Sequence, residues 1–193
     1  VFSGANMEGC KFEKANLDNA SFEGANLKGA NFDGVSAKGA NFYHAVIDEG
    51  LIQNSDFKRV FMKAAQGESI EIKNCNFNYS DLSYGKFNKN KMENVLLNNS
   101  DLKGVAMAGA DLKRVQMQHA ILEKAVLNGC HMVECDLQNV YAEDMKIQYA
   151  QIEKSIFKDI EAKGIDLSES ELDELVNLEG ANLENALLKK VNA

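Results

Sequence analysis

Histidine and cysteine are the residue types of this chain best suited to metal binding or nucleophilic catalysis. The three histidines, His44, His119 and His131, lie at unrelated points of the 193-residue sequence, with no second ligand at metal-binding spacing. No glycine-rich phosphate-binding loop and no cluster of catalytic side chains accompanies them. The sequence therefore predicts surface histidines, no metal or cofactor, and a protein that is not an enzyme.

The four cysteines occupy positions of a residue series that otherwise holds small side chains. They are Cys10, Cys75, Cys130 and Cys135. Thiols at such positions are expected to be buried and free, which agrees with a reducing compartment. A disulfide between Cys130 and Cys135 is the alternative.

A period of five organises nearly the whole chain. Positions five apart, from Phe2 to Leu172, hold Leu, Ile, Phe or Met. The exceptions are Ala37, Gly67, Ala142 and Ala162. A second series, two positions before the first, runs from Ala5 to Ser170 and holds mostly Ala, Cys, Gly, Ser or Val. The other positions are mostly polar, so both series are predicted to point into an apolar interior.

This period fits neither the roughly 3.6 residues of a helical turn nor the two of a strand. Each unit is therefore predicted to be a short extended piece followed by a corner. Four units would close one square coil, so that every twentieth position returns to the same place. With coils separated by the usual strand spacing of about 4.8 Å, the chain would form roughly nine to ten coils. We expect a single domain over residues 1–193, in which each coil contacts only its neighbours.

The repeated unit reads Ala-(Asn or Asp)-Leu followed by two variable residues. It stands at Ala15-Asn16-Leu17, Ala110-Asp111-Leu112 and Ala181-Asn182-Leu183. This pattern resembles the pentapeptide-repeat family, and related units cover essentially the whole chain. The resemblance implies an all-β, right-handed quadrilateral β-helix. Because the family also supplies domains of larger bacterial proteins, a fragment of a longer protein is one expectation.

The pattern of large and small residues changes near residues 140–167. The large series shrinks to Ala142 and Ala162, while the small series becomes Met145, Ile160 and Ile165. Large and small side chains have exchanged places at about constant volume, which cores tolerate. We therefore predict a locally reshaped but filled core.

Two further irregularities concern the backbone. Gly67 predicts a distorted corner or bulge with the Phe87 ring in the vacated space, or alternatively a protruding contact loop. After Leu172 the large series advances by one position and resumes at Leu178. A register shift with a bulge or short turn is therefore expected at about residues 173–177.

The net charge and the absence of long apolar stretches restrict the partners and the location that we expect for the protein. With 29 acidic and 21 basic side chains the net charge is −8, which argues against direct nucleic-acid binding and against capture by anionic membranes. No apolar stretch is long enough for membrane insertion and no export signal is visible, so we expect a reducing, cytoplasmic location. A secreted effector is the alternative, if a leader or flanking domain before Val1 has been removed.

Two groups of outward-facing residues are candidate interaction sites. The candidate partner-contact residues are Tyr43, Phe61, Ile121 and Tyr141. The candidate acidic patch is Glu169, Glu171, Asp173 and Glu174. The alternative for the first group is that these are scattered apolar surface residues without a partner. The alternative for the second group is a solvated end of the rod that discourages pairing with other strand edges.

The leading hypothesis is a structural or interaction scaffold that presents rigid faces to a protein partner of unknown identity. A homodimer through an uncapped end is a further expectation. The resemblance supplies the alternative function, because some family members imitate duplex DNA, bind DNA gyrase and confer quinolone resistance. Basic residues in the middle of the chain, such as Lys58, Arg59 and Lys63, count against such imitation.

Overall fold

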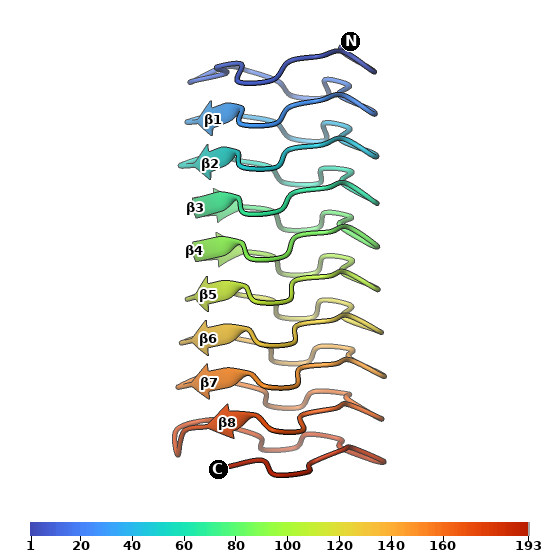
Figure 1. The fold of residues 1–193 in the computed structure, drawn as a ribbon, viewed down its shortest axis with the longest axis vertical. Helices are drawn as coiled ribbons and strands as arrows, with labels where there is room; N and C mark the ends of the chain where they lie inside the picture. The colour runs from blue at the N-terminus through green and yellow to red at the C-terminus, as the bar shows by residue number, and fades with distance from the viewer. Residues whose placement is uncertain (193) are drawn as a thin grey trace.

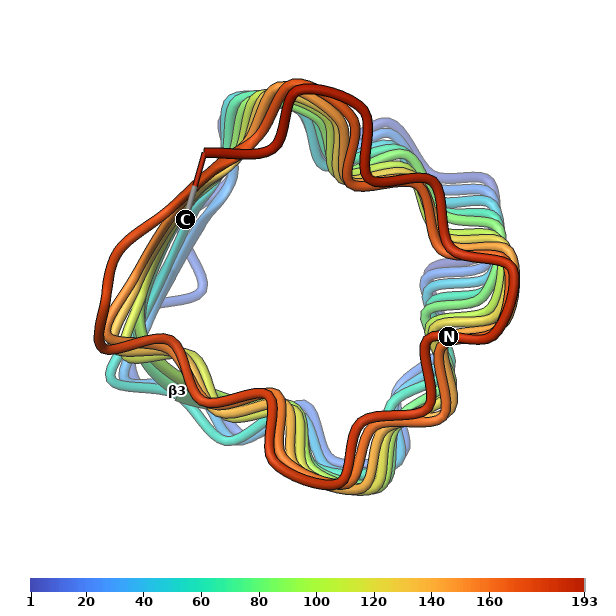
Figure 2. The same cartoon turned by 90° about the horizontal axis from the view of Figure 1, so that it is seen from below.

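The computed structural model describes residues 1–192, and in them the backbone winds as a four-sided β-solenoid without a helix (Figures 1 and 2). The two termini lie at opposite ends of a straight rod (Figure 1). Seen along the axis, successive coils lie over one another (Figure 2). The all-β solenoid is thus confirmed. No helix that could cross a membrane occurs in the described residues.

Eight short strands stack along one side of the rod as a parallel sheet in sequence order. They are β1 (Asn31–Asp33), β2 (Leu51–Gln53), β3 (Glu71–Asn76), β4 (Lys91–Leu96), β5 (Asp111–Lys113), β6 (His131–Val133), β7 (Gln151–Glu153) and β8 (Glu171–Leu172). Phe32 pairs with Ile52, and Ile52 pairs with Ile72. Equivalent residues therefore recur at every twentieth position, as the period of five predicts.

The strands mark about seven turns, slightly fewer than the predicted nine to ten coils. The difference arises at the ends, where isolated parallel bridges replace strands. Such bridges join Lys11 to Asn31 at one end and Glu171 to Asn192 at the other. The backbone ladder thus extends beyond the eight strands in both directions.

The pairing offset changes once, near β8. Gln151 pairs with Glu171 at the regular offset, whereas the partner of Ile156 is Asn177, one position further along the chain than that offset predicts. The extra residue lies in a turn in which the Val176 N–H donates to the Asp173 carbonyl oxygen at 3.1 Å. The ladder resumes beyond this turn, so the inserted residue shifts the register without ending the solenoid.

The corners share one backbone conformation. Every fifth residue from Gly4 to Glu169 has a positive φ, within the left-handed region. Most corners close by a turn hydrogen bond, as where the Ala25 N–H donates to the Phe22 carbonyl oxygen at 2.9 Å. A turn of this kind requires a positive φ at its third residue, which costs about 1–2 kcal/mol when that residue is not glycine. Side chains at these corners necessarily project away from the core.

The N-terminal core is built from stacked phenylalanine rings. Phe22 lies between Phe2 and Phe42, with ring centroids 5.2 and 4.9 Å away and planes nearly parallel. Phe32 contacts Phe42 edge to face at 6.0 Å. The stacking distance is close to the coil spacing because equivalent residues lie directly above one another.

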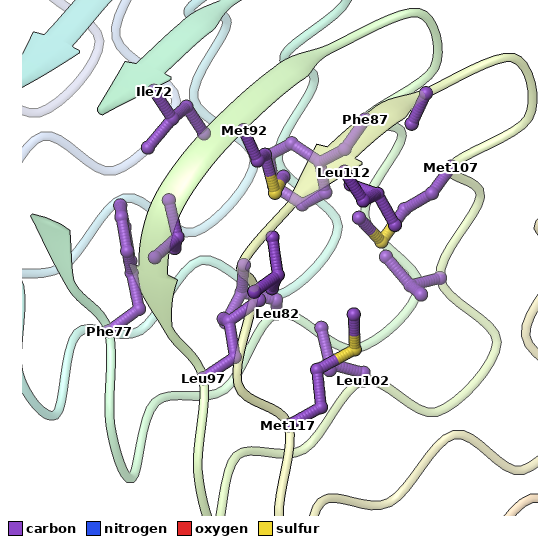
Figure 3. Packing of buried hydrophobic residues seen from close by; sticks show 14 of the residues in the cluster. Ile72, Phe77, Leu82, Phe87, Met92, Leu97, Leu102, Met107, Leu112 and Met117 are labelled. Carbon is purple, nitrogen blue, oxygen red and sulfur yellow. The ribbon is translucent and has the colours of Figure 1, made fainter. Parts of the chain in front are cut away.

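The middle of the core consists of four ladders of large side chains, which Figure 3 shows between residues 72 and 117. Leu82 and Leu102, for example, follow the paired residues Asp81 and Asp101 and belong to one ladder. The large residues that Figure 3 labels come from all four sides of the coil and are buried. The interior is therefore a packed column.

Gly67 leaves the pairing of the backbone unchanged. Gln66 pairs with Val46 and with Lys86 at the regular offset, so neither the predicted bulge nor a protruding loop occurs. A Cβ atom at position 67 would lie 2.8 Å from the Phe87 ring and 2.5 Å from Ile70 Cδ1. The prediction that Phe87 fills the vacated space is thus confirmed, together with Ile70.

The exchanged core of residues 140–167 is filled, as predicted. Ala142, Ala162 and Met145 are completely buried, and the exposed fraction of Ile165 is 1%. A void that Ile160 and Ile165 help to line has a volume of only about 10 Å³. That is about the space of one water molecule. Longer side chains in the small series therefore replace the volume that the alanines lack.

Candidate functional site

The histidines lie at the surface, but one of them has partners that the sequence reasoning missed. His131 Nδ1 is 3.5 Å from Asp111 Oδ1, and Nε2 is 3.4 Å from Glu153 Oε1. The two carboxylates contact opposite nitrogens of the His131 ring. Within residues 1–192, no group of three or more His, Cys, Asp or Glu side chains could hold a metal ion. The regular coil-to-coil pairing of Asp111 with His131 is the signal that could have predicted the first contact.

All four cysteines are free, and three of them are buried. Burial raises the pKa of Cys130 to about 12 and the pKa of Cys75 and of Cys135 to about 11. The Cys75 thiol also donates to the Ile52 carbonyl oxygen at 3.3 Å. A thiol that remains protonated is a poor nucleophile, so these three cysteines contribute to packing.

Three of the candidate partner-contact residues lie on one outward-facing column of the rod. The column runs through Phe61, Asp81, Asp101, Ile121 and Tyr141 by successive parallel bridges. Phe61 and Tyr141 are 56% and 60% exposed, and Ile121 is 39% exposed. Two aspartates separate Phe61 from the other two, so the column carries two apolar groups in place of one continuous patch.

Tyr43, the fourth candidate, lies outside this column. Its ring contacts the His44 ring with centroids 4.2 Å apart. His44 occupies a corner, where φ is 56°. Tyr43 is therefore near the corner that begins the next side of the coil.

The acidic patch is partly neutralised and partly structural. Glu169 forms an ion pair with Lys190 at 3.6 Å. The Asp173 carboxylate accepts the backbone N–H groups of Lys154 and Leu175 at 2.9 and 3.1 Å, which stabilises the inserted turn. Glu171 lies in β8 and Glu174 in the turn that follows. These four residues therefore do not form a uniform row of free carboxylates.

Some ion pairs cross a corner along a diagonal, which the sequence reasoning also missed. In these pairs a side chain just before a corner meets the corner residue of the next coil, one position beyond the regular pairing offset. Lys28 and Glu49 form such a pair at 3.0 Å, and Glu68 and Lys89 form one at 3.2 Å. The cation thus precedes the corner in the first pair and occupies the corner in the second.

At two neighbouring corners a tyrosine ring takes the place of the carboxylate. Lys58 Nζ lies 5.2 Å from the centroid of the Tyr79 ring, and Lys63 Nζ lies 5.7 Å from that of Tyr84. Both pairs follow the same corner diagonal as the ion pairs. These are cation–π contacts, in which the lysines keep a net positive charge.

Comparisons with known proteins agree with this geometry. The model of the family described as pentapeptide repeats matches the chain in eight copies, over ranges that include 1–36, 15–49, 25–63, 91–129 and 110–144. No curated protein matches the chain in sequence.

Solved structures with the same fold include two trypsin-treated variants of QnrB1, a plasmid-mediated fluoroquinolone resistance protein. The first has a TM-score of 0.82 at 14% identity and covers 96% of this chain and 92% of that one. The second has a TM-score of 0.63 at 20% identity, with 95% and 86% covered. HetL, a pentapeptide repeat protein from the cyanobacterium Nostoc, has a TM-score of 0.36 at 18% identity, with 97% and 87% covered. At these identities, the two QnrB1 variants show a shared fold only.

Proposed function

We propose that this chain, which belongs to the pentapeptide-repeat family, is a protein-binding scaffold without catalytic activity. The observation that carries the proposal is the outward column in which Phe61, Ile121 and Tyr141 are 56%, 39% and 60% exposed on a rod whose core is otherwise closed. Exposed aromatic side chains are typical of the residues that dominate binding energy at protein interfaces.

The backbone supports such a role because it holds these side chains in fixed positions. The Phe61 N–H donates to the Ala40 carbonyl oxygen at 3.0 Å, and the Phe61 carbonyl oxygen accepts the Phe42 N–H at 2.7 Å. Every outward position of the column is anchored in this way to its neighbouring coils. A partner would therefore meet preorganised side chains, which reduces the entropy that binding costs.

Affinity capture tests the proposal. The purified chain is immobilised, and the Phe61→Ser and Tyr141→Ser variants are compared with the wild type for the specific proteins they retain. We expect both variants to fold, because the side chains are exposed, and to lose the retained protein. Tyr149→Ser is the matched control, since Tyr149 is 59% exposed on another part of the coil. Equal retention by all three variants would contradict the assignment of this column.

A second candidate is a topoisomerase-binding role, which the acidic C-terminal section favours. Residues 131–193 hold 14 acidic and six basic side chains, a net charge of −8 that equals that of the whole chain. QnrB1, with the same fold, is a fluoroquinolone resistance protein. A DNA supercoiling assay with purified gyrase, with and without a fluoroquinolone, tests this role. The absence of both inhibition and drug protection at micromolar protein would reject this role.

The expected homodimer through an uncapped end remains part of the proposal. Leu187 and Leu188 are 47% and 51% exposed in the last described coil. Light scattering coupled to size exclusion would show a dimer whose formation Leu188→Glu prevents. A monomer at all concentrations would contradict it.

A further inference from the structure

We propose that one side of the rod, between residues 58 and 84, binds an acidic segment of a protein partner. This inference rests on the scaffold role proposed above and names the chemistry of its partner. The side chains that carry it are called here the aromatic–basic patch. They are Lys58, Arg59, Phe61, Lys63, Tyr79 and Tyr84.

The patch is continuous across one side of the coil and both of its corners. Phe61 lies on the outward column, with Arg59 and Lys63 two positions before and after it. Tyr79 and Tyr84 occupy the two flanking corners one coil later, with φ of 63° and 58°. Phe61, Tyr79 and Tyr84 are 56%, 53% and 52% exposed. Three exposed rings and three cations thus alternate within two coils, a width of about 10 Å.

The cations of the patch lack the carboxylate partners that some other lysines meet along the corner diagonal. Lys28 and Lys89 each meet a glutamate along the corner diagonal, but Lys58 and Lys63 meet tyrosine rings at that position. Among residues 1–192, Lys58, Arg59 and Lys63 form no ion pair. Their charge is therefore available to a carboxylate from another molecule.

The carboxylates nearest to the patch are already engaged. Asp81, which pairs with Phe61 in the next coil, accepts the Ser83 N–H at 2.9 Å and the Ser83 hydroxyl at 2.6 Å. Asp56, close to the Lys58 corner, forms an ion pair with Lys38 at 3.3 Å. Neither aspartate forms an ion pair with Arg59 or Lys63 in the part of the chain that the structure describes.

A surface hollow of about 480 Å³ adjoins the patch at the Lys58 corner. Lys38, Lys58 and Arg59 contribute cations to its lining, and Asp56 contributes the one carboxylate. Such a hollow offers room for an acidic side chain next to the exposed rings. Aromatic residues and arginine are also the types most enriched where protein partners bind.

The distribution of charge favours an acidic peptide segment over a nucleic-acid strand. Residues 51–130 hold eleven basic and eight acidic side chains, a net charge of +3, whereas residues 131–193 have a net charge of −8. A strand that follows the rod would enter this acidic section, and its phosphates would be repelled there. A short acidic segment with an aromatic or aliphatic side chain can stay within the two coils of the patch.

The test uses fluorescence polarisation with a short labelled peptide of repeated Glu-Glu-Phe-Ser units. Its counterpart with Gln in place of Glu and a labelled oligothymidylate serve as comparison probes. We expect the acidic peptide to bind best, and to bind at least about tenfold more weakly when NaCl rises from about 50 to about 500 mM. Tighter binding of the Gln peptide or of the oligothymidylate would overturn the proposal.

The decisive variant is Tyr79→Glu combined with Tyr84→Glu. It places carboxylates along the diagonal where Lys28 already meets Glu49, and Glu49 has the same corner conformation with φ of 58°. The variant should therefore fold, neutralise Lys58 and Lys63 internally, and bind the acidic peptide at least about tenfold more weakly. Asn139→Glu with Tyr149→Glu adds the same charge at two exposed corner positions outside the patch and should change binding by no more than about twofold. Equal losses in both double variants would overturn the proposal.

Capture from lysate separates this inference from the scaffold role. If the wild type retains a specific protein but fails to bind the acidic peptide, the scaffold stands and the acidic-segment inference is wrong. If the peptide binds and Tyr79→Glu with Tyr84→Glu abolishes both activities, both proposals are supported. If the acidic peptide binds as expected but no protein is retained by any form of the chain, the patch has its predicted chemistry and the scaffold role fails.

Discussion

Two regions of the core solve the same packing problem with opposite arrangements of large and small side chains. Near the N-terminus, Phe42 belongs to the large series and Ala45, three positions later, to the small one. Five coils further on, the same two columns hold Ala142 and Met145. All four residues are buried within 1%. The backbone pairing is the same in both regions, so the period and the hydrogen-bond ladder determine the fold while each pair of columns needs only a constant volume.

The largest expected effect is in the phenylalanine region. Phe42→Ala removes a ring that stacks on Phe22 at 4.9 Å and contacts Phe32 edge to face at 6.0 Å. We expect the free energy of unfolding to fall by about 3–5 kcal/mol, because rigid neighbouring coils cannot collapse into the cavity. Urea unfolding followed by circular dichroism measures it. A loss below about 1 kcal/mol would show that the stack adapts more freely than its regular spacing indicates.

The exchanged region gives the second prediction. Met145→Ala should cost about 2–5 kcal/mol, since both columns then hold alanine. Adding Ala142→Leu should recover at least half of that loss by restoring the arrangement found at Phe42 and Ala45. A double-mutant cycle from urea unfolding measures the coupling. Additive losses would mean that the two columns do not share one volume.

A buried polar residue between the two regions gives the third prediction. The Asn90 side chain is completely buried, and its Oδ1 accepts the Ile70 N–H at 2.8 Å. Its Nδ2 has no hydrogen-bond partner in the described residues. The hydroxyl of Ser80, at an equivalent inward position, accepts from Val60 and donates to Phe57.

Asn90→Ser is therefore expected to be at least as stable as the wild type. Asn90→Ala, which leaves the Ile70 N–H unpaired, should be about 1 kcal/mol less stable than Asn90→Ser. Thermal and urea unfolding of the pair measure the difference. Equal stabilities would show that the inward N–H finds another acceptor.

The smallest effect concerns the corners, which are the same in both regions. Ala64 and Tyr149 have φ of 56° and 57°, so Ala64→Gly and Tyr149→Gly should each stabilise the protein by about 0.5–1 kcal/mol. Ala108, which directly precedes a corner residue and does not itself have a positive φ, is the control, and Ala108→Gly should be destabilising by a similar amount. A gain at only one of the two corners would sharpen the contrast between the regions by showing that their backbones differ.

Most of the fold could be predicted from the sequence because one physical requirement repeats. A large apolar residue at every fifth position, with a small one two positions before it, can be buried only in a coil of short sides. The exchange at Ala142 and Met145 was also predictable, since it keeps the volume constant. Of the outcomes expected at Gly67, the bulge does not occur, because the Phe87 ring and Ile70 fill the space without changing the backbone pairing.

The candidate site was less predictable. Phe61 could be placed on an outward column from its position in the repeat. The contribution of Tyr79 and Tyr84 depends on a diagonal contact across the corner, which requires the left-handed corner geometry and cannot be read from the period. The same is true of Glu153, which meets His131 although it lies two positions beyond the regular pairing partner Gln151. Spacing identifies which residues face outward, but corner geometry decides which of them meet.

The distance between spin labels on one outward column tests the stacking of equivalent residues most directly. Glu23 and Glu143 are exposed and six coils apart, so labels at these positions in a Cys10→Ala background should be separated by about 29 Å, six times the strand spacing, with one narrow distribution. Pulsed dipolar spectroscopy measures this distance. A separation far from this value, or a broad distribution, would contradict a solenoid in which every twentieth residue lies above its predecessor.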